Sequence, residues 1–229
     1  VFITSDKCYE NKEWVWGYRE NDPMGGYDPY SSSKGCAELL IASYRSSFFS
    51  QNKINQNNVA IASARAGNVI GGGDWGENRL VPDLIKAFSN KNEAVIRNPD
   101  AVRPWQHVLE PLAGYLVLAE NLISDNDNSF TGAWNFGPDQ ADAQPVKWVA
   151  DKIVNCWPSE ANWKIDERHY PHEANYLKLD CSKALSRLNW SPKWNLDETI
   201  IKVVDWYSAF NNKKDVKEVC LKQIKEYMS

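Results

Sequence analysis

The chain has 229 residues, 43% of them hydrophobic, and a formal net charge of -4. This length can bury a sizeable core as one large domain or two small ones, and the even spread of charge argues against disorder, a coiled coil or a fibre. The negative balance gives no general attraction for nucleic acid, and no apolar run approaches the roughly 20 residues of a membrane-spanning helix. No charged-then-apolar leader opens the sequence, so we expect a globular protein without nucleic-acid or membrane partners.

The cysteines indicate the compartment. The five are an odd number at wide spacings, with no C-x-x-C pair, at Cys8, Cys36, Cys156, Cys181 and Cys220. This pattern fits reduced thiols in the cytoplasm better than a disulfide framework.

The first quarter of the chain predicts a parallel β-α-β unit. Residues 1–4 are typical of the end of a buried strand, and residues 10–29 are rich in turn formers and predict a long, functional loop. A helix is expected over 30–49, followed by a second apolar strand over 59–65. The apolar stripe of this helix is expected at Cys36, Leu39, Leu40, Ser43 and Tyr44.

Beyond Gly67 the sequence predicts shorter elements and a smaller second lobe, without an internal repeat. Helices are expected near 81–88, 109–123, 146–156, 182–188 and 196–210, with a lysine-rich surface helix over 213–227. Short strands are expected near 94–97, 133–136 and 176–179.

Tyr30 and Lys34 begin the first helix and lie about one turn apart on one face. A nearby ammonium favours the phenolate and makes tyrosine a usable base for a sugar or alcohol hydroxyl. The spacing alone occurs by chance in many helices. Ser5 adds context, because it follows a strand at the carboxyl edge of the sheet, where ligands of open parallel sheets bind.

Ser5, Tyr30 and Lys34 together resemble the catalytic set of the extended short-chain dehydrogenase/reductase superfamily. Longer motifs extend the resemblance over essentially the whole chain, and the sequence is similar to the CDP-glucose 4,6-dehydratase family. These motifs are TSDKCYENKEWVWGYRENDPMGGYDPYSSSKGCAELL, RAGNVIGGGDW, NRLVPD, RPWQHVLEPLAGY, WNFGP and NYLKLDCSKALSRLNW.

The resemblance implies an α/β fold. Residues 1–66 would form the C-terminal part of a Rossmann-like, doubly wound parallel sheet that binds NAD. Residues 67–229 would form mainly a smaller α/β lobe that binds the nucleotide sugar, with some segments packing back on the first part. No glycine-rich dinucleotide-binding turn follows the first strand, so we expect about half of the nucleotide domain to be absent.

The resemblance also implies an NAD-dependent lyase that removes water from CDP-glucose in deoxysugar and O-antigen biosynthesis. Tyr30, with Ser5 and Lys34, would take the C4 hydroxyl proton, and Tyr30 and Lys34 would also contact NAD. Asp6 would be the acid for the departing C6 hydroxyl. Lys7, or a water that it relays, would remove the C5 proton. Lys7 stands where the dTDP-glucose branch has glutamate, and it can act as a base only with a neutral amine.

Five further positions are expected to bind the substrate. Asn68 matches an asparagine near the sugar pyrophosphate, and we favour this role over that of a turn residue. Arg103 matches an arginine that grips the diphosphate, because a guanidinium suits two phosphate oxygens. Arg79, Arg97 and Tyr176 are weaker candidates.

Two other motifs suggest no chemistry. Gly71–Gly73 lacks the Gly-Lys-Ser/Thr of a phosphate loop and predicts a turn that lines the substrate cleft. His169 and His172 have Pro171 between them and no cysteine or acidic cluster nearby, so we expect no metal site there.

Two alternatives remain open: a catalytically silent module that binds sugar nucleotides, and an epimerase of the same superfamily. Asp6 and Lys7 beside Ser5 argue against the epimerase, because epimerisation at C4 needs no acid and base at C5 and C6. A half-sheet with an exposed edge should also pair with another chain, so we expect a homo-oligomer.

Overall fold

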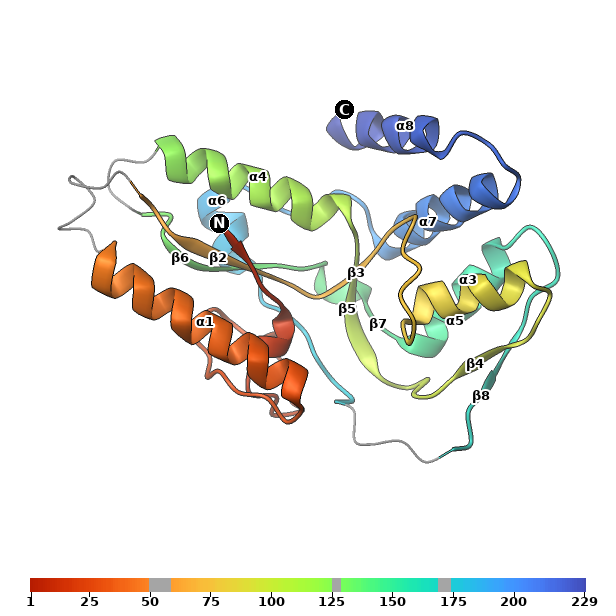
Figure 1. Cartoon of the computed structure of the whole chain (residues 1–229), viewed down its shortest axis with the longest axis horizontal. Helices are drawn as coiled ribbons and strands as arrows, with labels where there is room; N and C mark the ends of the chain where they lie inside the picture. Colours follow the sequence, from red (N-terminus) through yellow and green to blue (C-terminus); the bar gives the residue numbers. More distant parts are fainter. Residues whose placement is uncertain (50–58, 125–128, 169–173) are drawn as a thin grey trace.

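The computed structural model describes residues 1–49, 59–124, 129–168 and 174–229. The chain forms two lobes (Figure 1). The first is built on a parallel sheet in the order β1-β2-β6, and the predicted β-α-β unit is confirmed by the register of Phe2 with Ser63. The strands are β1 (Phe2–Ile3), β2 (Ala62–Ala66) and β6 (Gly132–Phe136).

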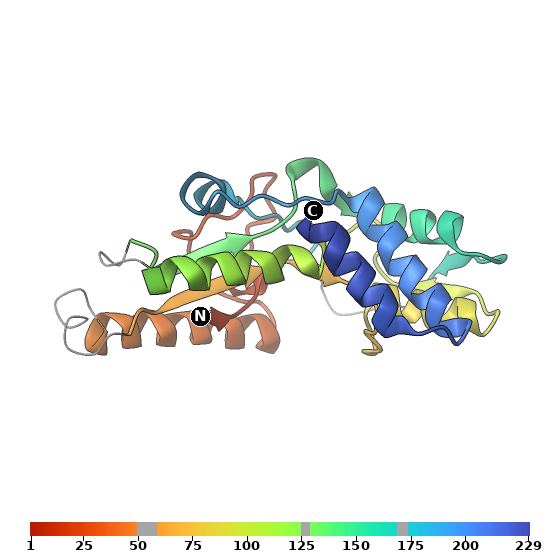
Figure 2. The ribbon, with the colours of Figure 1, turned by 90° about the horizontal axis from the view of Figure 1, so that it is seen from above.

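Helices flank this sheet. Helix α1 (Pro29–Phe48) lies on the opposite side of the sheet from α6 (Ser182–Leu188) (Figure 2). The core also receives Leu118 from α4 (Leu109–Ser124), which packs with Trp134 and Phe136. Because β6, α4 and α6 all come after residue 67, the second part of the sequence contributes to both lobes. The domain division at residues 66/67 stays a prediction.

The second lobe combines two small sheets with a layer of helices. Strand β5 (Val102–His107) pairs parallel with β3 (Asn68–Ile70) and antiparallel with β7 (Ala143–Pro145). Strand β4 (Ala94–Ile96) pairs parallel with β8 (Trp163–Ile165). The helices are α3 (Leu80–Ser89), α5 (Val146–Cys156), α7 (Leu196–Asn211) and α8 (Val216–Met228).

The core of the second lobe lies between α3, α5 and α7 and contains Ile85, Ile153 and Tyr207. None of the described helices combines the length and apolarity that crossing a bilayer requires. The described residues also form two short 3-10 turns, η1 (Asp6–Cys8) and η2 (Gln140–Asp142).

The helices predicted within the described residues are confirmed to within a few residues, but the strand predicted over 176–179 is wrong. That segment is extended and forms only single bridges, Val102 with Tyr176 and Tyr18 with Leu179. Its backbone bonds instead partly to Val102 of β5 and partly to the loop of residues 10–29. Strands β3, β5, β7 and β8 were not predicted.

The prediction that the apolar stripe of α1 is its buried face is also wrong. Leu39 and Leu40 are 61% and 59% exposed, and Tyr44 is 51% exposed. The buried side chains are instead Ser31, Gly35, Glu38 and Ile41. The inner face of α1 is small and polar because it packs against η1 and a buried charge network.

Candidate active site

A cleft of about 500 Å³ is lined by residues of both lobes. It brings together Ser5, Asp6, Lys7 and Tyr30 at the carboxyl edge of the first sheet. Four of the five predicted substrate positions lie in the same lining, namely Asn68, Arg79, Arg97 and Arg103. Lys34 and Tyr176 are outside this lining.

Ser5, Asp6 and Lys7 form one compact turn directly after β1. The Ser5 side chain caps η1, because its Oγ accepts the Lys7 backbone N–H at 3.2 Å. The same hydroxyl donates to Asp6 Oδ1 at 3.0 Å. This turn presents a hydroxyl, a carboxyl and an amine to the cleft in three successive residues.

The Asp6 carboxyl is only 2% exposed, and its Oδ2 has no hydrogen-bond partner. Burial raises the pKa of Asp6 above its usual range, and the charges of Lys7 and Arg103 with the Ser5 hydrogen bond offset only part of this. A buried carboxyl with a raised pKa favours the neutral acid, which is the form that can donate a proton.

Tyr30 stands at the start of α1 and is 55% exposed. Asp28 caps the helix by accepting the Ser31 backbone N–H at 3.0 Å, and Pro29 occupies the first turn. The Lys34 ammonium lies 5.5 Å from the centre of the Tyr30 ring. The predicted pair is therefore close, and of the two only Tyr30 belongs to the lining of the cleft.

The arginines of the cleft differ in their surroundings. Arg103 is buried, and its guanidinium donates to the backbone oxygens of Val102 and Ala174. Arg79 is largely exposed and pairs with Asp74 at 2.9 Å. The charge of Arg97 acts on Asp83, whose pKa is raised overall by burial. The cleft thus combines one fixed guanidinium with one that is held only by a surface ion pair.

A second cleft of about 580 Å³ shares Asp6, Lys7 and Tyr30 with the first. Its lining includes Glu10 and Glu13, which were not predicted as site residues. The Glu13 carboxylate accepts the backbone N–H groups of Asn175 and Tyr176, each at 3.0 Å. The length of the 10–29 loop was the one sequence signal that pointed to this region.

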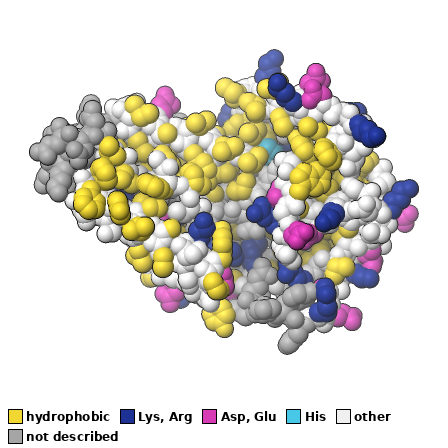
Figure 3. Space-filling view, viewed as in Figure 1, with side chains coloured by type: hydrophobic (Ala, Val, Ile, Leu, Met, Phe, Trp, Pro, Cys, Tyr) yellow, Lys and Arg dark blue, Asp and Glu magenta, His cyan; other side chains and the backbone are white. Residues whose placement is uncertain are grey.

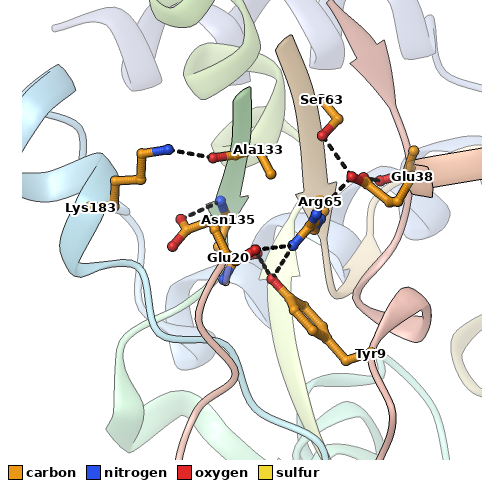
Figure 4. Close-up of polar contacts among 9 residues, drawn as sticks. Tyr9, Glu20, Glu38, Ser63, Arg65, Ala133, Asn135 and Lys183 are labelled. Atoms are coloured by element: carbon orange, nitrogen blue, oxygen red, sulfur yellow. Dashed lines mark hydrogen bonds and ion pairs between the residues drawn. The ribbon is translucent and has the colours of Figure 1, made fainter. Parts of the chain in front are cut away.

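A buried polar network joins α1, β2 and β6 (Figure 4). Arg65 at the end of β2 pairs with Glu38 of α1 at 2.7 Å, and both side chains are at most 4% exposed. Arg65 also donates to the Tyr9 hydroxyl at 2.8 Å. Tyr9 in turn donates to Asn135 of β6 at 2.7 Å. The sequence patterns did not indicate these residues, because isolated polar positions carry no periodic signal.

The glycines after β3 form a turn whose backbone is covered by other side chains. Gly71, Gly73 and Gly76 have the spacing G-x-G-x-x-G, which is by itself a weak signal. A Cβ at Gly72 would meet the Trp206 ring at 2.1 Å, and Asp74 accepts the Gly76 backbone N–H at 3.0 Å. Indole and carboxylate groups therefore occupy the space in which a phosphate would have to approach this backbone.

Within the described residues, no group of three or more histidine, cysteine, aspartate or glutamate side chains is arranged to hold a metal. His169 and His172 lie outside the described residues. His107 is buried against Trp194, and burial lowers its pKa to about 4.

The sequence profile of the GDP-mannose 4,6 dehydratase family matches residues 1–203. The chain belongs to this family. It is 53% identical over all of its 229 residues to the CDP-glucose 4,6-dehydratase of Salmonella typhimurium, and it spans 64% of that protein. It is 20% identical to the dTDP-glucose 4,6-dehydratase of Shigella flexneri, with 92% of this chain and 58% of that protein covered.

Solved structures support the fold. The dTDP-glucose 4,6-dehydratase from Bacillus anthracis in complex with NAD matches with a TM-score of 0.72 and 17% identity, over 95% of this chain and 63% of that one. A UDP-glucuronic acid 4-epimerase from Bacillus cereus matches with a TM-score of 0.75 and 17% identity, over 91% and 60%. The predicted α/β fold class, part of a Rossmann-like sheet with a smaller lobe, is confirmed.

Proposed function

We propose that this chain carries the catalytic turn and the nucleotide-sugar site of an enzyme that dehydrates CDP-D-glucose to CDP-4-dehydro-6-deoxy-D-glucose. The observation that carries the proposal is the shared cleft, where the turn of Ser5, Asp6 and Lys7 meets Tyr30 and three arginines. The choice of cytidine rests on the 53% identity to the Salmonella relative.

NAD is the cofactor that we propose, and when bound it accepts hydride from the sugar C4 and returns it to C6. Tyr30 and Lys34 would hold its nicotinamide end, because both project from the start of α1 at the carboxyl edge of the sheet. The orphaned Oδ2 of Asp6 supports a polar group bound next to the turn.

The residues of the turn have separate proposed roles. Tyr30 takes the proton of the C4 hydroxyl, while the Ser5 hydroxyl positions that oxygen and the Lys34 ammonium supports the phenolate. Oxidation at C4 acidifies the C5 proton, which Lys7 or a water beside it removes. Asp6 then gives its proton to the departing C6 hydroxyl, and its burial supports the neutral form needed for that step.

The diphosphate is proposed to bind between Arg103 and Arg79, with Arg97 and Asn68 nearby in the same lining. Tyr176 is proposed to bind the substrate at the edge of this site, because its backbone bridges to Val102, the residue before Arg103.

The test uses the chain joined to the part of the Salmonella relative that it does not match. This protein is incubated with NAD and CDP-glucose in deuterated water, and the product is analysed by mass spectrometry. We expect loss of one water and incorporation of solvent deuterium at C5. Tyr30→Phe should abolish product formation, whereas Tyr44→Phe, on the exposed side of the same helix, should not.

Other outcomes of this assay identify the alternatives. Binding of CDP-glucose without any product would favour a silent binding module. Inversion at C4 without loss of water would favour an epimerase. UDP-glucose and dTDP-glucose serve as competing substrates, and a preference for either would overturn the assignment of cytidine.

A homo-oligomer is proposed from the surface of the first lobe. Exposed hydrophobic side chains gather over the part of the molecule where α1 lies (Figure 3), and the outer face of α1 exposes Leu39 and Leu40. Size-exclusion chromatography with light scattering tests this, and Leu40→Lys should shift the protein toward monomer. A monomeric parent protein would contradict the proposal. A cytoplasmic location is proposed from the cysteine pattern of the sequence.

A further inference from the structure

We propose that Glu38 and Arg65 are positioning residues, which together fix the Ser5–Asp6–Lys7 turn against the helix that carries Tyr30. The inference rests on the proposed dehydratase function and adds two residues to it. Neither side chain lines the cleft, so both would act through the groups that they hold.

Glu38 fixes the beginning of the turn. Its carboxylate accepts hydrogen bonds from the hydroxyls of Thr4 and Ser63. Thr4 directly precedes Ser5, while Ser63 lies on β2 opposite Phe2. Glu38 is about two helical turns after Tyr30 on α1. One carboxylate therefore sets the position of the catalytic helix relative to the strand end that carries Ser5.

Arg65 fixes the other end of the turn. It donates to the Tyr9 hydroxyl at 2.8 Å and to the backbone oxygen of Glu20 at 3.1 Å. Its guanidinium also lies 5.0 Å from the centre of the Tyr9 ring. Tyr9 is the residue immediately after η1. The segment from Thr4 to Tyr9 is thus held at one end by Glu38 and at the other by Arg65.

The ion pair between them makes the two anchors one unit (Figure 4). Glu38 and Arg65 approach to 2.7 Å and are 4% and 3% exposed. Burial would push the pKa of Glu38 upward, but the hydrogen bond and charge of Arg65, with the Thr4 and Ser63 hydroxyls, hold it below its usual range. The pair therefore stays ionised, and each partner keeps the other in place.

Stability alone does not account for such a pair. Desolvation of two buried charges offsets most of their attraction, so a well-packed neutral pair of similar volume is often as stable. An apolar pair would lack the directed hydrogen bonds to Thr4 and Tyr9. Because misplacement of reacting groups by about 1 Å can cost about 100-fold in rate, the anchors should matter for kcat more than for folding.

The experiment compares Glu38→Met, Arg65→Met and the double variant in the protein joined to the unmatched part of the Salmonella relative. Each single variant should lower kcat about tenfold or more and leave the KM for CDP-glucose within about twofold. The double variant should recover the melting temperature lost by the single variants, because it leaves no unpaired buried charge, but it should not recover kcat.

The matched control is Lys152→Met with Asp197→Asn, an exposed pair at 2.6 Å between α5 and α7, which should leave kcat unchanged. A double variant with wild-type kcat would overturn the positioning role, as would a KM that rises in proportion to the loss of kcat.

Hydrogen exchange separates this proposal from the proposed function. The backbone N–H groups of Lys7, Cys8 and Tyr9 are bonded within the turn, and they should exchange faster in the double variant, while those of β5 should not. If the parent protein lacks dehydratase activity but the variant shows faster exchange, the function fails and the anchoring stands. Unchanged exchange at these three amides would overturn the anchoring.

Discussion

The Glu13 carboxylate accepts the backbone N–H of Tyr176, a residue 163 positions further along the chain. Asn11, two residues before Glu13, donates to the Tyr176 backbone oxygen at 2.9 Å. The loop after the catalytic turn therefore binds both the backbone N–H and the backbone oxygen of one residue in the segment opposite it. Since Arg103 donates to Ala174 of the same segment, this clamp helps to set the width of the cleft.

Glu13→Ala should raise the KM for CDP-glucose about fivefold, corresponding to about 1 kcal/mol for lost hydrogen bonds at an exposed position, with kcat little changed. Glu160→Ala, another exposed glutamate, is the control. Glu13 also has a φ of 54°, so Glu13→Gly should lose the clamp equally but be about 0.5–1 kcal/mol more stable than Glu13→Ala. Steady-state kinetics and thermal unfolding measure both effects. A KM unchanged in both variants would contradict the clamp.

Arg79→Ala should weaken substrate binding about tenfold without a measurable loss of stability. Arg79 is 66% exposed and pairs with Asp74 at 2.9 Å, and such surface pairs contribute about 0–1 kcal/mol. Its proposed contact with the diphosphate is charge-assisted and stronger. Arg19→Ala serves as the control, because Arg19 is 64% exposed and pairs with Asp22 at 3.6 Å. Titration of CDP-glucose by calorimetry gives the affinities, and equal affinities in the two variants would exclude a phosphate contact for Arg79.

Asp6→Asn should lower the rate of water loss about 10²–10⁴-fold, because the amide cannot supply the acid proton. Asp205→Asn, at an exposed position, should have the wild-type rate. Mass spectrometry of the product follows both reactions. A rate for Asp6→Asn within a few-fold of the parent would remove Asp6 from the mechanism.

The same substitution should change the pH dependence of stability. Because the pKa of Asp6 in the folded state is raised above its ordinary value of 3.8, the folded protein binds this proton more tightly than the unfolded chain. The stabilisation is complete below pH 3.8 and is lost as the pH rises through the folded-state pKa. Asp6→Asn should therefore raise the melting temperature at pH 8, with a smaller gain near pH 4. A gain independent of pH would mean that the carboxyl does not titrate in this range.

Glu110→Ala should destabilise the fold by about 2–3 kcal/mol and leave the KM unchanged. Glu110 is fully buried at the start of α4 and accepts the backbone N–H groups of Lys193 and Trp194 and the hydroxyl of Tyr227. Glu120→Ala, on the exposed face of the same helix, is the matched control. Urea unfolding measures the difference, and equal stability of the two variants would contradict a role of Glu110 in anchoring the C-terminal helix.

The sequence predicted the positions of elements better than the faces that they bury. Helix α1 was expected over 30–49 and spans Pro29–Phe48. Its apolar stripe, however, faces solvent and is not buried in the core. Hydrophobic periodicity detects the face with the most apolar side chains, whereas the buried face of α1 meets a polar turn and carries Glu38. Strand β5 was missed for the opposite reason. Its residues Arg103, Gln106 and His107 are polar although they are buried, so no apolar run indicated a strand.

The candidate site was predictable to the extent that it follows contiguous motifs. Ser5, Asp6, Lys7 and Tyr30 meet in one cleft, as the order of strand and helix suggested. Glu13 and Arg65 were missed because their contacts join segments distant in sequence, and no local spacing encodes such contacts.

The loop of residues 10–29 is bonded to the opposite segment at Glu13 and at Tyr18, and the side chains of Val15 and Trp16 between these two points are exposed. Glu13 binds the 175–176 backbone and Tyr18 bonds to Lys178 and Asp180, whereas Val15 and Trp16 are 64% and 69% exposed. A short affinity tag or fluorescent reporter inserted between Val15 and Trp16 would thus project into solvent from a rigid base beside the cleft. It would give the enzyme an immobilisation handle that leaves the catalytic turn untouched.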